Sequence, residues 1–431
     1  MIDGSVELPV SKSVANRRMI IDAIAGSPLP KLPLEVCGTD IVTLHDALSN
    51  PDATEINVGG AGTAMRFLTA YLASQPGRRV TLDGDERMRQ RPIGPLVEAL
   101  RQLGARITYG GAEGFPPLII EGRQLTGGDL SIEAGVSSQF ASALLLIAPT
   151  MAEGLKLKLK GEVKSEPYII MTLELMSRRG ADTDYDKLDH VATVRPCSYE
   201  PENDAPIERD WSAMSFWTEL AAVTTGFIEV KGLDRFSSQG DRVVMSLFEE
   251  LGCGEAEPDE DDGEDAHKSD DETIVLCGSP DQAPRLIYDF SGCPDLAQPA
   301  IVTCCLVGIP FKATGLETLV VKETDRVTAL VEELRKMGVV ITREAAGVLA
   351  WEGRRVPIES LPEFSARGDH RMAMSLAPAA YILPGIVIDG AECVDKSYPG
   401  YWKQLQGLGF RFVDGNIPLS ELTAQGEGQE E

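Results

Sequence analysis

Residues 330–341 read Leu-Val-Glu-Glu-Leu-Arg-Lys-Met-Gly-Val-Val-Ile, the pattern of an amphipathic helix that ends at Gly338 and continues into an apolar strand. A glycine placed directly after a helix adopts the left-handed conformation without steric cost, and so turns the chain into the strand. The same pattern recurs with its glycine at positions 104, 180, 252 and 409, and a weaker copy ends at Asn50. Successive glycines lie 76, 72, 86 and 71 residues apart. This spacing is too long for a solenoid and predicts six α/β units of about 70 residues each.

Length and hydropathy indicate a soluble protein of more than one domain. The chain has 431 residues, 43% of them hydrophobic. Single hydrophobic cores stop growing at about 250–300 residues, so we expect about two domains. The longest apolar stretches, 140–152 and 300–310, are shorter than the roughly 18 residues that a membrane-spanning helix needs. The first twenty residues carry Asp3 and Glu7 and no apolar core, which predicts a cytoplasmic protein without a secretory signal.

The charge balance is strongly acidic. Lys and Arg number 40 against 67 Asp and Glu, a formal net charge of −27. Such a field disfavours nucleic acid and anionic membranes as partners, so an anionic ligand needs a local basic pocket. Residues 255–272 hold eleven acids and one lysine, and the tail 425–431 is similar. Without apolar residues to offset the entropy of ordering, both are predicted to be flexible and solvated, with metal binding by the insert as the alternative.

The cysteines point to no metal and no disulfide framework. Eight are scattered along the chain, and only Cys304 and Cys305 are adjacent. A long chain with this spacing is expected to hold buried thiols and no zinc site, so we predict no metal and no cofactor.

Basic residues gather with hydroxyls and glycines in several segments, a composition that suits binding of phosphate and carboxylate groups. Lys12 and Ser13 precede a helical run, where backbone N–H groups and the helix dipole favour an anion; the alternative is an N-cap with an incidental lysine. The glycine-rich residues 59–62 open another helix, although turns need glycine anyway. Residues 87–91 hold three arginines, which need counter-charges from a ligand or from the acids at 83–86.

The second half of the chain adds carboxylates to this inventory. Lys322 and Arg326 lie four residues apart on one predicted helix face, with Glu323 between them, although ordinary salt bridges would also explain that pattern. Asp295 is at another helix start, and Arg371 follows Asp369 and His370. Many cations with at least two carboxylates indicate chemistry on a doubly anionic substrate by charge stabilisation and proton transfer.

These segments resemble, in order and spacing, the motifs of the 5-enolpyruvylshikimate-3-phosphate (EPSP) synthase family of enolpyruvyl transferases. The motifs are Ser11-Lys-Ser13, Ala61-Gly-Thr-Ala-Met-Arg66, Arg91-Pro-Ile-Gly94, Ser137-Ser-Gln139, Ser165-Glu-Pro-Tyr168, Lys322-Glu-Thr-Asp-Arg326 and Asp369-His-Arg-Met-Ala-Met374. The resemblance implies a two-domain α/β fold, an inside-out α/β barrel with six βαβαββ repeats, three in each domain. The inserted domain would span 11–208, and the second would combine 1–10 with 209–431.

The resemblance also implies the reaction. The family moves the enolpyruvyl group of phosphoenolpyruvate to the 5-hydroxyl of shikimate 3-phosphate and releases phosphate, through a tetrahedral intermediate, in the shikimate pathway to chorismate and the aromatic amino acids. Domain closure would complete the site. Asp295 is expected to take the hydroxyl proton, and Glu323 with Lys12 to move the proton at the vinyl carbon. A monomer is expected, and the family is the target of the herbicide glyphosate.

Ligand contacts transfer by resemblance to matching positions. Shikimate 3-phosphate would be held by Lys12, Ser13, Arg17, Ser137, Ser138, Gln139, Ser165, Tyr168, Asp295 and Lys322. Phosphoenolpyruvate would be held by Lys12, Gly62, Arg91, Gln139, Arg326, Arg371 and Lys396.

The sequence departs from the family pattern at three positions. Gly60 replaces the usual Asn, Phe67 replaces the common Pro, and Thr318 replaces an Asn that some members use to bind shikimate 3-phosphate. One alternative is the related UDP-N-acetylglucosamine enolpyruvyl transferase, but this chain has no Cys between positions 37 and 197 to match the reactive cysteine of that enzyme. The other is a catalytically silent homologue that binds phosphorylated ligands, yet Lys12, Asp295 and Glu323 are all present.

Overall fold

The computed structural model describes residues 2–133, 135, 138–201, 206–256, 273–412 and 418–422, apart from the side chains of residue 35 and of residues 418–422. Most of the acidic insert, the tail 425–431 and the predicted ligand residue Ser137 lie outside the described residues. The chain forms two compact units. The inserted unit comprises residues 10–207 with 238–240, and the terminal unit comprises 1–9, 208–237 and 241–431. In the described part of the chain, no helix has the length and apolar character needed to cross a membrane.

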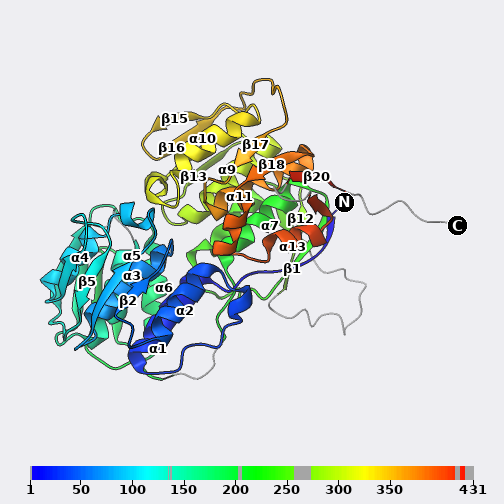
Figure 1. Cartoon of the computed structure of the whole chain (residues 1–431). Coiled ribbons are helices and arrows are strands. Elements are labelled where there is room, and N and C mark those ends of the chain that lie inside the picture. The colour runs from blue at the N-terminus through cyan, green and yellow to red at the C-terminus, as the bar shows by residue number, and fades with distance from the viewer. Residues whose placement is uncertain are drawn as a thin grey trace, which may run out of the picture. The chain divides into compact units, whose positions relative to one another are not determined.

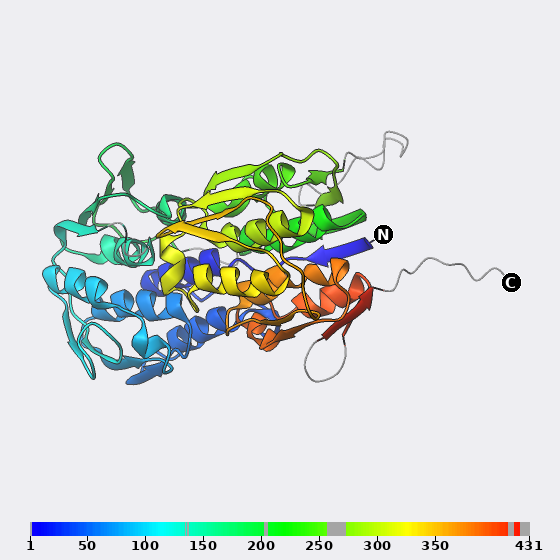
Figure 2. The same ribbon diagram turned by 90° about the horizontal axis from the view of Figure 1, so that it is seen from above.

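Three four-stranded sheets build the terminal unit (Figure 1). The first sheet holds β1 (Ile2–Glu7), β10 (Gly226–Lys231), β12 (Thr273–Gly278) and β11 (Cys253–Glu255) in that order. The second holds β13 (Leu286–Asp289), β14 (Phe311–Thr314), β16 (Val348–Trp351) and β15 (Thr342–Ala345). The third holds β17 (Glu363–Ser365), β18 (Ile386–Asp389), β20 (Pro418–Leu422) and β19 (Phe410–Phe412). Figure 2 shows β1, in dark blue, beside the green segments of this unit, which are more than 200 residues away in the sequence.

The helices of the terminal unit alternate with its strands. They are α7 (Trp211–Val223), α8 (Val244–Glu249), α9 (Ala297–Val307), α10 (Arg326–Lys336), α11 (His370–Leu376), α12 (Ala379–Ile382) and α13 (Tyr401–Gly407), with 3₁₀ turns η4 (Gly240–Val243), η5 (Pro294–Leu296), η6 (Glu317–Val321) and η7 (Ala391–Lys396). Each sheet pairs its first two strands in parallel and its remaining strands antiparallel. A helical segment connects the two parallel strands, and in the first sheet the inserted unit also lies between them in the sequence. This is the βαβαββ repeat, present three times.

The inserted unit has two such sheets. One holds β2 (Glu55–Asn57), β3 (Arg79–Asp83), β5 (Leu118–Glu121) and β4 (Arg106–Tyr109), and the other holds β6 (Gly128–Glu133), β7 (Leu155–Lys160), β9 (Val191–Val194) and β8 (Thr183–Asp186). The helices are α1 (Lys12–Ala25), α2 (Thr39–Ser49), α3 (Gly62–Ala73), α4 (Gly94–Gln102), α5 (Ser138–Ile147) and α6 (Glu166–Ser177), with η1 (Leu34–Val36), η2 (Met88–Gln90) and η3 (Ala148–Thr150).

The α/β class is confirmed, and the glycine pattern succeeds in five of its six copies. The glycines at 104, 180, 252, 338 and 409 all have φ between 78° and 98°, and each precedes the edge strand of its sheet. The sixth, weaker copy also has its helix, α2, its cap residue, Asn50, and a following strand, β2, but Asn50 is not left-handed, with φ of −117°, and β2 begins the sheet of the next repeat. Helices α1 and α2 therefore form a repeat without a sheet among the described residues. The connection between them carries Pro28, Pro30 and Pro33, which donate no hydrogen bond to a ladder.

Buried central helices organise each unit. In the terminal unit, α7, α9 and α11 pack against one another, and residues 211–222 of α7 are all buried. In the inserted unit, α3 packs against α1 and α5. A helix that is buried on all sides belongs in a core, which is where these central helices lie. All eight cysteines are free thiols, and Cys37, Cys253, Cys293, Cys304 and Cys305 are buried.

Candidate active site

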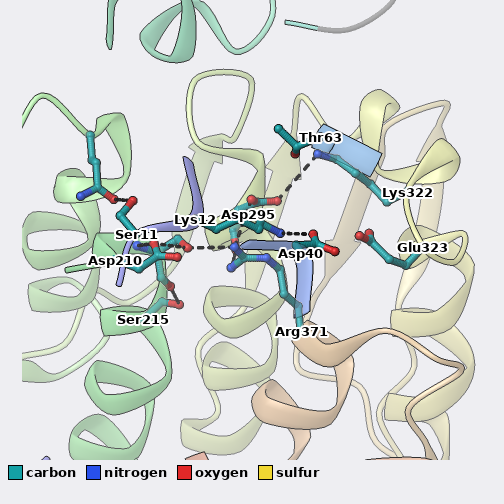
Figure 3. A network of polar contacts seen from close by, with 12 residues as sticks. Ser11, Lys12, Asp40, Thr63, Asp210, Ser215, Asp295, Lys322, Glu323 and Arg371 are labelled. Atoms are coloured by element: carbon teal, nitrogen blue, oxygen red, sulfur yellow. Dashed lines mark hydrogen bonds and ion pairs between the residues drawn. The ribbon is translucent and has the colours of Figure 1, made fainter. Parts of the chain in front are cut away.

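Asp295 is the centre of a charged cluster in the terminal unit, just before α9. Arg326 Nη1 lies 3.1 Å from its Oδ1, and Arg371 Nη2 lies 3.1 Å from its Oδ2. Lys322 Nζ is 3.9 Å from Oδ1 (Figure 3). Each oxygen of Asp295 is therefore held by a guanidinium, while 20% of the side chain stays exposed and accessible to a ligand.

Arg326 links three carboxylates. Its Nε and Nη2 donate to Asp369, the N-cap residue of α11, at 2.7 and 3.2 Å, and Nη2 also donates to Glu323 Oε2 at 3.0 Å. Burial alone would lower the pKa of Arg326, but Asp369, Glu323 and Asp295 outweigh it and raise that pKa. The Arg326 guanidinium is thus a permanent charge, fixed by bonds from both sides.

Two lysines complete the cluster. Lys396 Nζ lies 3.1 Å from Glu323 Oε1, so both oxygens of Glu323 have cationic partners. Desolvation lowers the pKa of Lys322, and Asp295 opposes that shift. Four cations against three carboxylates leave the cluster with excess positive charge in a strongly acidic protein, which favours an anionic ligand.

The N-terminal end of α7 positions Arg371 through hydrogen bonds. Its Nη1 donates to the backbone oxygen of Asp295 at 3.3 Å, and its Nη2 donates to Ser212 Oγ at 2.8 Å. The Ser212 hydroxyl in turn donates to Oδ1 of Asp210, the N-cap residue of α7, at 2.7 Å. The backbone of Asp210 donates to the oxygen of Pro9 at 2.9 Å. A continuous chain of hydrogen bonds therefore runs from residues 9 and 210 to Arg371.

In the inserted unit, Lys12 is the first residue of α1 and is paired with an acid that the sequence analysis missed. Lys12 Nζ lies 3.2 Å from Asp40 Oδ2, and the side chain of Asp40 is only 4% exposed (Figure 3). Asp40 lies in the first turn of α2. Its only sequence signal is an acid at a helix start, which the helix dipole explains by itself.

Arg17 is buried one turn further along α1. Its Nε donates to Thr172 Oγ1 at 2.7 Å, and its Nη2 donates to Ser142 Oγ at 3.0 Å. It also reaches the backbone oxygens of Ser13 and Tyr168, at 2.8 and 3.4 Å. Among the predicted ligands, Arg17, Ser13 and Tyr168 are therefore brought together, although the contacts use backbone atoms of Ser13 and Tyr168. Burial lowers the pKa of Arg17 to about 10.

The N-terminus of α3 presents a second positive cluster. A Cβ at Gly62 would lie 2.7 Å from Arg91 Nη1 and 3.1 Å from Arg66 Nη1, so two guanidiniums lie directly against this glycine. Arg91 Nε is buried and has no hydrogen-bond acceptor among the described residues. Gln139, on α5, donates to Thr63 Oγ1 at 3.1 Å. This arrangement leaves donors available for an anion.

The remaining predicted residues lie at helix starts. Ser138 begins α5, and Ser165 is the N-cap residue of α6, with φ of 58°.

Of the three arginines at 87–91, Arg89 is paired with Asp83, as the counter-charge alternative anticipated. The sequence analysis gave no role to four hydroxyl residues that contact the predicted site residues: Thr63, which lies within a quoted motif, and Ser142, Thr172 and Ser212, which lie outside the motifs. Within the described residues, no group of His, Cys, Asp or Glu is arranged to hold a metal.

The fold and these clusters define a class of protein: an α/β protein of repeated βαβαββ units in which cationic side chains that favour an anionic ligand gather near helix N-termini. Residues 36–405 match the sequence model of the protein family EPSP synthase (3-phosphoshikimate 1-carboxyvinyltransferase). A 3-phosphoshikimate 1-carboxyvinyltransferase of Bacteroides fragilis is 44% identical over 95% of this chain and 96% of its own length. One from Shewanella baltica is 32% identical over 94% of this chain and 97% of its own.

The solved structure of EPSP synthase from Acinetobacter baumannii shares the fold. It aligns with a TM-score of 0.69 at 20% identity, over 97% of this chain and 96% of its own. The chain belongs to the EPSP synthase family. It is an enzyme of the shikimate pathway that transfers the enolpyruvyl group of phosphoenolpyruvate to shikimate 3-phosphate. The predicted activity is confirmed, and the UDP-N-acetylglucosamine alternative is set aside.

Proposed function

We propose that Asp295, Glu323 and Lys12 carry the proton transfers of this reaction. The shikimate 3-phosphate hydroxyl gives its proton to Asp295 as its oxygen bonds to C2 of phosphoenolpyruvate, and a proton added to C3 turns the methylene into a methyl. The tetrahedral intermediate then loses a methyl proton as the bond from C2 to the phosphate oxygen breaks, which releases phosphate. The observation that carries this proposal is the position of Asp295 and Glu323 among four cations that suit an anionic substrate.

Glu323 and Lys12 are assigned to the proton at C3. Glu323 is 13% exposed and oriented by Arg326 and Lys396. The ammonium of Lys12 is oriented by Asp40. A general acid or base needs a side-chain orientation that is held by its neighbours, and the contacts of Glu323 and Lys12 provide one for each.

We also propose the substrate contacts that the family resemblance implies. Shikimate 3-phosphate is assigned to Lys12, Ser13, Arg17, Ser137, Ser138, Gln139, Ser165, Tyr168, Asp295 and Lys322. Phosphoenolpyruvate is assigned to Lys12, Gly62, Arg91, Gln139, Arg326, Arg371 and Lys396. The buried Arg91 Nε without an acceptor supports the second set, since buried cationic donors need partners that an anion supplies. The two compact units are proposed as the two domains of the family fold.

Deuterium exchange tests the assignment of the proton carriers. In D₂O, reversible addition of the shikimate 3-phosphate hydroxyl to phosphoenolpyruvate replaces the vinyl protons with deuterium. NMR measures this replacement directly. We expect Glu323→Gln to slow this exchange by about 100-fold or more, a typical contribution of general acid–base catalysis. Lys396→Met, which leaves Glu323 in place but removes one orienting cation, is expected to slow it less. Unchanged exchange in Glu323→Gln would contradict the assignment.

We further propose that the enzyme acts in the cytoplasm as a monomer. Eight free thiols suit a reducing compartment. Light scattering that gives 46.5 kDa in solution would support the monomer, and twice that mass would contradict it.

A further inference from the structure

Arg17 is a buried cation that lacks a carboxylate partner among the described residues. It is 3% exposed, and its four protein acceptors are two hydroxyls and two backbone carbonyls. None of the described carboxylates is paired with it. Because a guanidinium has five N–H donors, one remains for a ligand. A buried charge is costly without compensation, so another group has to stabilise this guanidinium before an anion arrives.

Phe67 supplies that compensation. Arg17 Cζ lies over the Phe67 ring, 5.5 Å from its centroid. The ring is 1% exposed and belongs to α3, while Arg17 belongs to α1, which packs against α3. An aromatic face carries negative electrostatic potential and attracts a cation within about 6 Å, and this attraction strengthens where water is excluded. The residue that departs from the family pattern at position 67 therefore contacts a proposed substrate-binding residue.

We propose that Phe67 is a positioning residue for the binding of shikimate 3-phosphate, acting through the face of its ring on Arg17. The inference rests on the proposed role of Arg17. The ring holds the guanidinium plane, Thr172 and Ser142 fix its edges, and the remaining N–H donor meets an anionic oxygen of the substrate. Phe67 also follows Gly62 on α3 by five residues, so one helix serves both proposed substrate groups.

Fluorination separates this role from core filling. A residue that only fills space acts through its volume, whereas a cation held over a ring depends on the ring's electron density. Incorporation of mono-, di- and trifluorophenylalanine at position 67 lowers that density stepwise with little change in shape. We expect the dissociation constant for shikimate 3-phosphate, measured by calorimetry, to rise at each step. Phe67→Leu is expected to raise it roughly 3- to 30-fold.

Matched variants complete the test. Phe248→Leu makes the same substitution at a buried phenylalanine of α8 with no cation over its ring among the described residues, and it is expected to lower thermal stability without changing shikimate 3-phosphate affinity. Arg17→Lys keeps the charge but loses the planar fork, and it is expected to weaken binding at least tenfold.

The outcomes are distinguishable. Affinity that falls with fluorination supports the inference. Affinity that is flat across the fluorinated series while Arg17→Lys binds poorly would overturn the role of Phe67 and leave Arg17 as a ligand. Unchanged binding in Arg17→Lys would overturn the assignment of Arg17, and the role of Phe67 with it. Because the fluorinated proteins keep the native shape, the test does not depend on Phe67→Leu folding.

Discussion

Gly62 lies where a methyl group has no room. The Cβ of Gly62→Ala would come within 2.7 and 3.0 Å of Arg91 Nη1 and Nη2. The end of an arginine side chain can move, so we expect the variant to fold normally but with Arg91 displaced. Because a hydrogen bond to a charged group contributes about 1.5–3 kcal/mol, the KM for phosphoenolpyruvate should rise about tenfold or more. Steady-state kinetics with each substrate varied in turn would measure this.

The control for this substitution is Gly407→Ala. Nothing lies within 4 Å of a Cβ at Gly407, which is in α13 and does not have positive φ. That variant is expected to match the parent enzyme in both KM values. A KM for phosphoenolpyruvate that stays at the parent value in Gly62→Ala would contradict the assignment of Gly62 and Arg91.

The proposed role of Lys322 in binding predicts that the affinity for shikimate 3-phosphate depends on pH. Burial holds the pKa of Lys322 below the ordinary 10.5, with Asp295 opposing the shift. The ammonium is protonated below this lowered pKa and loses its charge as the pH rises through it. Affinity for shikimate 3-phosphate should therefore fall at a pH below 10.5. In Lys322→Arg the charge persists, so this limb of the binding profile should move to higher pH. Calorimetry across alkaline pH measures it, and identical limbs in the two proteins would contradict the role of Lys322.

Individual residues differ in how well a sequence reveals them. Lys322, Glu323 and Arg326 stand together in one motif, and the structure brings them into one cluster. Asp40 went unnoticed because its partner Lys12 lies 28 residues away and the pair depends on how α1 and α2 pack. Asp369 belongs to the motif that contains Arg371, but its sequence does not reveal that it fixes Arg326 through two hydrogen bonds.

At the scale of an element, the first turn of α7 is a support for Arg371. Ser212→Ala removes the hydroxyl that accepts from Arg371 Nη2. Because Arg371 keeps its contacts with Asp295, we expect a moderate effect, about a threefold to tenfold rise in the KM for phosphoenolpyruvate. Shikimate 3-phosphate binding should be unchanged, and Ser212→Thr should restore much of the loss.

Ser215 provides a matched control on the same helix (Figure 3). It is also buried, but its hydroxyl donates only to the backbone oxygen of Ser212. Ser215→Ala is therefore expected to change stability more than the KM for phosphoenolpyruvate. Equal KM effects in the two alanine variants would show that Ser212 has no special relation to Arg371.

Helices and strands can be predicted from the sequence where neighbouring residues determine them. Five glycines take the left-handed conformation because the chain must leave a helix there, and the sequence pattern contains both the helix and the strand. The sixth copy of the pattern predicts its helix and the following strand, but the partner of that strand is a non-local property. Nothing near Asn50 indicates that β2 pairs with β3 of the following repeat.

At the scale of the whole molecule, the acidic field acts against anionic substrates. Replacing residues 257–272 with a short Asn-Gly turn would join β11 to β12, which already pair antiparallel, and would remove ten carboxylates and one lysine. We expect faster association of shikimate 3-phosphate at low ionic strength, with the difference largely gone near 0.15 M salt, where screening acts over about 8 Å. Stopped-flow measurements at two salt concentrations would show this. An association rate that the replacement leaves unchanged at low ionic strength would contradict this expectation.

We propose that the cluster around Asp295 carries out enolpyruvyl transfer, and a measurement of phosphate release decides whether it does. Purified enzyme is given phosphoenolpyruvate, shikimate 3-phosphate or both, in the parent form and as Asp295→Asn. We expect phosphate only when both substrates are present, with a rate at least about 100-fold lower in Asp295→Asn while calorimetry still detects bound shikimate 3-phosphate. Phosphate released from phosphoenolpyruvate alone, or released at the parent rate by Asp295→Asn, would contradict it.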